Sequence, residues 1–185
     1  TPNTVPTEAA VRAYLSSELS KLRANSAAGF DGIPPHFIKY ARVAHISAEG
    51  REVHVNVLEP ILGKFFHHMI VHGVVPKAWK QARISPLYKK GPISEPKSYR
   101  MLAVNPVLYR LYANVVRGFV TEWCVAHKRV PDTQFGFYPK RSTLDPIFIL
   151  RHLIKLAKHR KRVNRDPSSR LYAAFMDFTQ AYDHV

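Results

Sequence analysis

An uninterrupted apolar run, residues 171–176, stops abruptly at the carboxylate of Asp177. The run contains no glycine or proline, and this pattern predicts a strand that is buried on both faces. A strand of this kind would deliver the acid to the edge of a sheet. Asp183 follows six residues later, and Thr179 between the two acids is placed to cap a helix. The order of strand, tight turn and helix start is the geometry of a metal site.

The length of the chain predicts one ordinary domain with a real core. It has 185 residues, 46% of them hydrophobic, and no apolar run of 18 residues, which argues against a membrane span. We therefore expect a soluble globular protein. Because the first residue is Thr1 and the last lies two positions beyond Asp183, we expect both ends to be cut from a longer chain.

The single cysteine, Cys124, excludes an internal disulfide and fits a reducing compartment. It lies among Phe119, Val120 and Trp123, so we expect a buried thiol without a chemical role. The expected location is intracellular, in the cytoplasm and nucleus.

The net charge of +15 is concentrated in two segments. Residues 1–76 carry 7 Lys and Arg against 6 Asp and Glu, whereas residues 77–117 carry 9 against 1 and residues 128–170 carry 12 against 3. A sustained positive field suits a polyanion, because each phosphate that is neutralised releases condensed counterions. We therefore expect nucleic acid as a partner. A solvated basic surface is the alternative.

Helical spacing of apolar residues and capping residues together predict a helix-rich chain. Thr7 is placed to cap the first helix, Gly73 to end the third, and Asn105 to cap the fourth, which we expect to be core along its length. The helices are expected at 7–25, 34–40, 46–81 (clearest at 61–71), 106–124 and 143–162.

A β-hairpin is expected between the third and fourth helices. Residues 82–88 contain a short strand interrupted by Pro86, which confines it to an edge or a bulge, and a loop rich in Gly, Pro and Ser returns the chain to Arg100. Lys89 and Lys90 before the loop would then converge with Arg100 after it. A planar guanidinium flanked by ammonium groups is suited to a triphosphate. A solvated hairpin is the alternative.

Two further patterns have ordinary explanations. His67, His68 and His72 include a pair on one helix face, but no Cys, Asp or Glu joins them within reach in the sequence, so we expect no zinc site. The basic run 155–170 fits a nuclear-localisation or nucleic-acid-binding tail. It fits equally well a basic helix end followed by the turn at Asp166.

Four blocks of the chain, taken in order, resemble the reverse transcriptases of non-LTR (LINE-type) retrotransposons. "AFMDFTQAYDHV" at the C-terminal end resembles motif A of that family, and the 79–116 block resembles its motifs 1 and 2. Ala28-Gly29-x-Asp31-Gly32-Ile33-Pro34 resembles a segment near the start of the polymerase domain. The pattern "Q-x-G-F... R-S-T" is met by Gln134, Gly136, Phe137, Arg141, Ser142 and Thr143.

The resemblance at motif A implies a catalytic role for Asp177. In that family the first acid binds two catalytic magnesium ions and the next backbone carbonyl, here that of Phe178, assists. The aromatic residue five positions on, here Tyr182, lies beneath the sugar of the incoming nucleotide and crowds a ribose 2′-hydroxyl. Gln180 and Ala181 are expected to bind substrate beside it. The family usually has Phe where this chain has Tyr182.

The resemblance in the other blocks implies contacts to phosphates and template. The family's hairpin folds over the incoming nucleotide, which makes Lys89, Lys90 and Arg100 the expected phosphate clamp. Gln134 and Arg141 are expected to contact template or nucleotide. The chain departs from the family's usual residues at Phe30, Met101, Tyr138 and Lys140.

We therefore expect an α/β, helix-rich fold: the fingers and first palm strand of a right-hand polymerase, truncated, with an N-terminal helical segment at 1–27 and a partial reverse transcriptase domain at 28–185. Expected partners are an RNA template, a DNA primer, a deoxynucleotide, Mg²⁺ (or Mn²⁺), and missing palm and thumb segments. The family's downstream Asp-Asp hairpin has no counterpart here, so we expect the chain alone to be inactive. The alternatives are a catalytically dead nucleic-acid-binding remnant and a maturase-like or telomerase-like polymerase.

Overall fold

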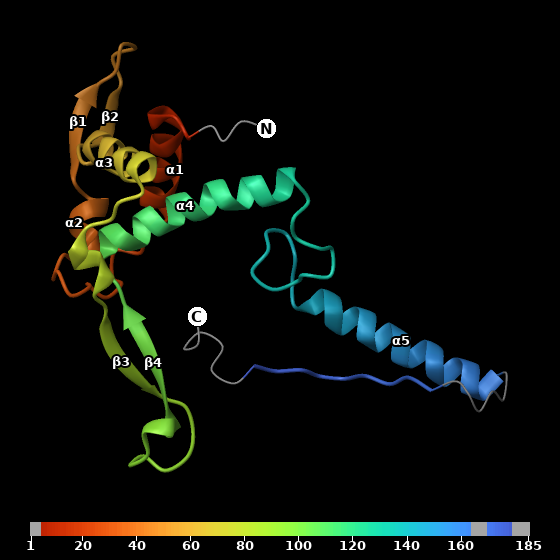
Figure 1. Cartoon of the computed structure of the whole chain (residues 1–185). Helices are drawn as coiled ribbons and strands as arrows, with labels where there is room; N and C mark the ends of the chain where they lie inside the picture. The colour runs from red at the N-terminus through yellow and green to blue at the C-terminus, as the bar shows by residue number, and fades with distance from the viewer. Residues whose placement is uncertain (1–4, 164–169, 179–185) are drawn as a thin grey trace. The chain divides into compact units, whose positions relative to one another are not determined.

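The computed structural model describes residues 5–163 and 170–178 (Figure 1). It contains two compact units, Thr1–His127 and Lys128–Val185. The first unit holds α1 (Glu8–Lys21), α2 (Pro35–Lys39), β1 (Arg42–Ile46), β2 (Glu52–Asn56), α3 (Glu59–His72), β3 (Arg83–Tyr88), β4 (Tyr99–Val104), α4 (Val107–Ala126) and two short 3-10 turns, η1 (Lys77–Lys80) and η2 (Pro96–Ser98); the second holds α5 (Leu144–Val163). This mixture of helices with two small sheets is consistent with the predicted α/β class.

In the described ranges, no helix combines the length and apolar character that crossing a membrane requires.

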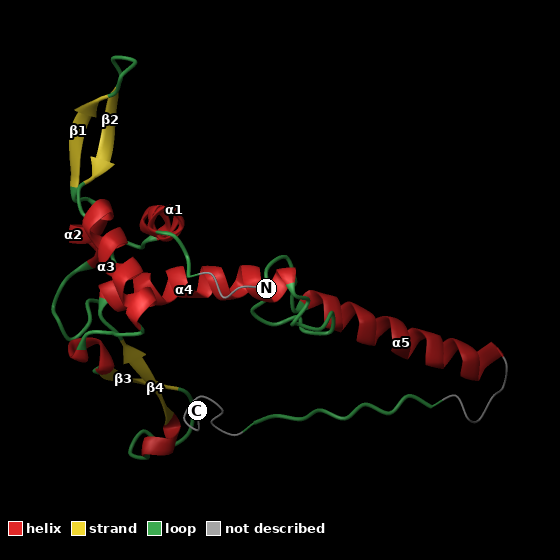
Figure 2. Ribbon diagram, turned by 45° about the horizontal axis from the view of Figure 1, so that its top comes forward, coloured by secondary structure: helices red, strands yellow, loops and turns green. Residues whose placement is uncertain are grey.

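The core of the first unit lies where α1, α3 and α4 meet (Figure 2). Phe66 of α3 is fully buried, and its ring lies 5.4 Å from that of Tyr112 on α4 and 6.3 Å from that of Trp79. Burying an aromatic side chain of this size removes much apolar surface from water. The other buried apolar residues are Val11, Leu15, Leu19, Ile38, Leu62, Met69, Val107, Leu111 and Val115.

Two of the three predicted signals at helix ends are confirmed, those of Thr7 and Gly73. The Thr7 hydroxyl oxygen accepts a hydrogen bond from the backbone N–H of Ala10, as an N-cap does, and α1 ends at Lys21 rather than at the predicted residue 25. Gly73 ends α3 in the left-handed conformation, at φ 64°. The capping prediction for Asn105 was wrong: the N-cap position is Pro106, and no side chain caps α4.

A glycine allows the loop before α2 to lie against the start of α4. A Cβ on Gly29 would lie 2.5 Å from the Cα and the N of Pro106, which real Cβ atoms essentially never do. The same junction is joined by Arg110, whose Nη2 donates a 2.8 Å hydrogen bond to the carbonyl of Ala27. Only a residue without a side chain fits at position 29.

The helix predicted over 46–81 was wrong in its first part, because residues 42–56 form the β1–β2 hairpin. Val43 pairs with Val55 and His45 with Val53, so the valines fall at alternate positions, as β structure favours. Gly50 turns the chain at φ 73°. Helical signals begin only at Glu59, after this hairpin.

The second half of α4 is not core, contrary to the prediction. Val120, Trp123 and Val125 are each at least half exposed, and Cys124 is only partly buried. The contacts of α4 with α1 reach Phe119, whose ring lies 4.6 Å from that of Tyr14. Helical periodicity reports which residues share a face, but a second element must cover that face before it is buried.

Tyr14 of α1 also lies close to a charged residue of α4. The carboxylate of Glu122 lies near its hydroxyl. Burial and this neighbouring negative charge raise the pKa of Tyr14 to about 12.

The prediction of a strand at 171–176 was also wrong, because no second element among the residues that the structure describes covers this segment. Residues 170–178 form no regular secondary structure, and their side chains are exposed, with Phe175 at 85% and Met176 at 92%. A strand exists only when another strand satisfies its backbone N–H and C=O groups. Within the described part of the second unit there is no other strand to do so.

Candidate nucleic-acid interface

The predicted hairpin is confirmed as the β3–β4 pair, antiparallel from Arg83 opposite Val104 to Tyr88 opposite Tyr99. Pro86 lies within β3 and faces Met101. Because proline cannot donate to a ladder, it is tolerated here, where β3 has a neighbour on one side only.

Two tyrosines stabilise the loop at the end of this hairpin. The Tyr88 and Tyr99 rings lie 5.7 Å apart, their hydroxyls donating to the carbonyls of Gly91 (2.8 Å) and Ile93 (2.9 Å) respectively. The Lys89 N–H donates to the buried Ser98 carbonyl at 2.8 Å and so extends the ladder by one pair. Sequence reasoning missed both tyrosines, although an aromatic pair flanking a Gly/Pro loop is a recognisable cross-strand signal.

The register places two of the three predicted phosphate ligands on one face of the hairpin. Side chains alternate along each strand, so Lys89 and Arg100 fall on the face opposite the tyrosine pair, while Lys90 lies in the bend that follows. All three side chains are exposed. None of them has a hydrogen bond or ion pair to another residue in the described part of the chain. The hairpin therefore presents cations that are free to bind an external anion.

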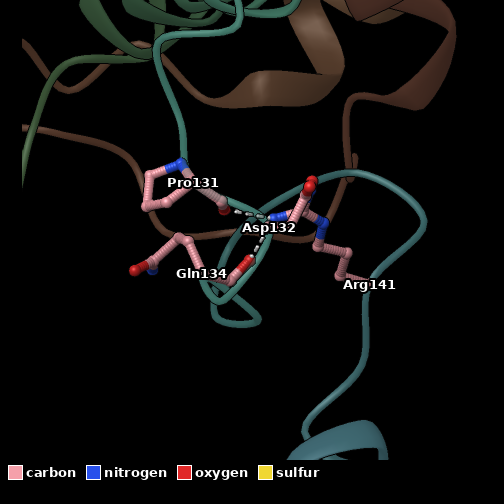
Figure 3. A network of polar contacts seen from close by, with 4 residues as sticks. All are labelled: Pro131, Asp132, Gln134 and Arg141. Atoms are coloured by element: carbon pink, nitrogen blue, oxygen red, sulfur yellow. Dashed lines mark hydrogen bonds and ion pairs between the residues drawn. The ribbon is translucent and has the colours of Figure 1, made fainter.

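The loop between α4 and α5 is the second predicted block, and Arg141 dominates it (Figure 3). Arg141 Nη1 donates to the backbone carbonyls of Pro131 (2.7 Å) and Gln134 (2.9 Å), and Nη2 contacts a carboxylate oxygen of Asp132 (2.9 Å). Its guanidinium carbon also lies 4.4 Å from the ring centre of Tyr138. The Gln134 side chain donates to the carbonyl of Gly136 at 3.0 Å. Both predicted ligands thus have partners inside their own loop.

The predicted metal ligand Asp177 is exposed in the irregular 170–178 segment, and so is the adjacent Phe178. Carboxylate and carbonyl oxygens are the donor types that Mg²⁺ prefers. The described residues contain no group of three His, Cys, Asp or Glu side chains that could hold a metal ion. The carboxylate of Asp177 and the carbonyl of Phe178 are therefore suitable ligand types for Mg²⁺, but two ligands do not make a complete site. Gln180, Ala181 and Tyr182 lie outside the described residues.

The chain belongs to the reverse transcriptase family, because the family model described as "Reverse transcriptase (RNA-dependent DNA polymerase)" matches residues 87–185.

Two relatives from Drosophila melanogaster make the assignment more specific. One is the "Probable RNA-directed DNA polymerase from transposon BS", 30% identical over 112 residues, which is 60% of this chain and 12% of the relative. The other is the "RNA-directed DNA polymerase from mobile element jockey", 26% identical over 125 residues, which is 67% of this chain and 13% of the relative. The resemblance to non-LTR retrotransposon reverse transcriptases is therefore confirmed. The chain spans about an eighth of the length of these relatives.

Proposed function

We propose that this chain forms the fingers and the start of the palm, within residues 28–185, of an RNA-directed DNA polymerase. In this proposal it binds the incoming deoxynucleotide and an RNA template paired with a DNA primer. The protein that contains it would act in the cytoplasm and nucleus.

The observation that carries the proposal is the β3–β4 hairpin, which presents Arg100 and Lys89 on one face with no partner among the described residues. An arginine fork forms bidentate hydrogen bonds with phosphate oxygens, and an ammonium group adds a point charge. The ladder and the two tyrosine hydroxyls fix the backbone that carries them. A triphosphate would therefore meet cations that are carried by an ordered backbone, and their side chains would become ordered when it binds.

We assign the remaining predicted ligands to the same substrates. Asp177, with the carbonyl of Phe178, would supply part of a magnesium site whose other ligands come from elsewhere in the polymerase. Tyr182 would lie under the nucleotide sugar, beside Gln180 and Ala181. The loop that contains Gln134 and Arg141 would lie along the template.

Binding of a fluorescent deoxynucleoside triphosphate by the 185-residue chain tests the hairpin assignment. Arg100→Met should weaken binding about tenfold, since a hydrogen bond to a charged group contributes roughly 1.5–3 kcal/mol. Arg51→Met is the matched control, because Arg51 is an exposed arginine next to the turn of the other hairpin. Equal binding by the two variants would contradict the assignment.

Binding of labelled RNA tests the wider proposal. The affinity should fall steeply with salt, with a log–log slope of roughly −0.7 to −0.9 per phosphate contacted, and should depend little on the RNA sequence. An affinity that does not change with salt would refute phosphate-based binding.

A further inference from the structure

The loop between α4 and α5 is closed on itself by one side chain. Arg141 stands near the C-terminal end of the loop, and its hydrogen bonds end on the carbonyls of Pro131 and Gln134 and on the carboxylate of Asp132, near the other end (Figure 3). Its side chain is 21% exposed although the acid that it pairs with is fully exposed. Three donated hydrogen bonds thus join two parts of the loop that are up to ten residues apart.

The conformation that this closure maintains is an unusual one. Phe137 and Lys140 both adopt positive φ angles, 59° and 61°, which residues with a side chain rarely do. Such angles persist when the surrounding structure over-determines them. The loop contributes only two backbone hydrogen bonds of its own at this point, Gln134 to Pro131 and Arg141 to Tyr138. The Arg141 side chain is therefore the principal constraint in the described loop.

The arrangement uses the shape of arginine as well as its charge. A guanidinium is planar and has five N–H donors in a fixed fork, three of which are used here while its face lies over Tyr138. A lysine ammonium at the same place could not reach three acceptors and stack on the ring as well. The charge alone is not enough to close the loop.

We propose that Arg141 is a positioning residue: it holds loop 131–141 in the conformation that meets nucleic acid, and it does not itself contact phosphate. This inference rests on the proposed function, in which the loop lies along the template. It assigns to Arg141 a role different from the direct contact that the family resemblance implies.

The first test is hydrogen–deuterium exchange on the 185-residue chain with Arg141→Lys and Arg141→Met. Both variants should lose protection at the amides of Gln134 and of residue 141, while the melting temperature of the α1–α3–α4 core stays that of the unsubstituted chain. Protection that survives in Arg141→Met would overturn the positioning role.

The second test uses the salt dependence of RNA binding to separate positioning from contact. Positioning predicts that the lysine and methionine variants lose the same several-fold affinity while the log–log salt slope stays unchanged. Direct phosphate contact predicts near-normal binding by the lysine variant and, for the methionine variant, a slope smaller by roughly 0.7–0.9. Arg151→Met, on exposed α5, serves as the charge-matched control. If the unsubstituted chain binds no RNA, the proposed function fails, while the exchange data still decide what Arg141 does for the loop.

Discussion

Replacing Gly29 by alanine should open the junction between the loop before α2 and the start of α4. The added Cβ would lie 2.5 Å from two backbone atoms of Pro106 and 2.8 Å from the carbonyl carbon of Asn105. Carbon atoms in contact normally lie about 3.5–4.0 Å apart, so the two segments must separate by roughly 1 Å. Backbone atoms cannot rotate away as a flexible side chain can. The strain must therefore displace the loop or α4.

The loss in the free energy of unfolding has two sources, the overpacking itself and the hydrogen bond that the displacement stretches. Overpacking of this kind typically destabilises a protein by about 1–3 kcal/mol. The hydrogen bond from Arg110 to the carbonyl of Ala27, now 2.8 Å long, spans the same junction and would stretch, which adds about 1 kcal/mol. We expect a loss of roughly 2–4 kcal/mol in the free energy of unfolding, which lowers the melting temperature by about 10 °C for a unit of this size.

Thermal and urea unfolding followed by circular dichroism would measure this loss. Gly136→Ala is the control, because the nearest atom to its Cβ would be 3.7 Å away and its φ is not positive, so its effect should stay within about 0.5 kcal/mol. Should Gly29→Ala prove as stable as the control, the close approach of Gly29 to Pro106 would be wrong.

Three more predictions concern the core, the pH dependence of stability and the selection of deoxynucleotides by Tyr182. Phe66→Ala should cost about 3–5 kcal/mol in the free energy of unfolding, and Phe65→Ala clearly less because Phe65 is 39% exposed; equal losses would contradict the packing. Since folding raises the pKa of Tyr14 from 10.0 to about 12, the stability from its neutral form is complete below pH 10 and disappears as the pH rises to 12. Glu122→Gln should reduce this loss in alkaline unfolding titrations, and an unchanged titration would show that the carboxylate has no part in it. In a polymerase containing this chain, Tyr182→Ala should raise the incorporation of ribonucleotides relative to deoxynucleotides. An unchanged ratio would contradict the proposed position of Tyr182 under the nucleotide sugar.

Features set by a few neighbouring residues could be predicted from the sequence. The left-handed Gly73, the Thr7 cap and the β3–β4 hairpin around its Gly/Pro loop all depend on local conformational preferences. Family motifs predict Arg100 and Lys89 as phosphate ligands, and strand alternation places these two on one face of the hairpin, while their role stays a prediction.

Features that need a distant partner could not be predicted in the same way. The apolar residues 171–176 are typical of a buried strand. A strand also requires a neighbouring strand to pair with, and the local sequence does not show whether one is present. The β1–β2 hairpin was missed because the helix predicted over 46–81 includes β2, whose valines Val53 and Val55 alternate along the strand. Arg141 closes its loop through hydrogen bonds to backbone carbonyls up to ten residues away. Every residue has a backbone carbonyl, so the sequence does not show which ones an arginine will contact.

Primer extension tests most directly whether this chain carries part of a polymerase active site. The assay would use an RNA template, a DNA primer and Mg²⁺ or Mn²⁺, with a protein in which this chain is continued to the length of its relatives. Asp177→Asn should abolish the product, because in our proposal its carboxylate holds a catalytic metal ion. Glu49→Gln, which changes an exposed acid at the turn of the β1–β2 hairpin, should leave synthesis largely intact. The 185-residue chain alone should give no product, because one carboxylate cannot place two metal ions. Full activity of the Asp177→Asn protein, or synthesis by the 185-residue chain alone, would contradict the assignment of Asp177 as one acid of a shared metal site.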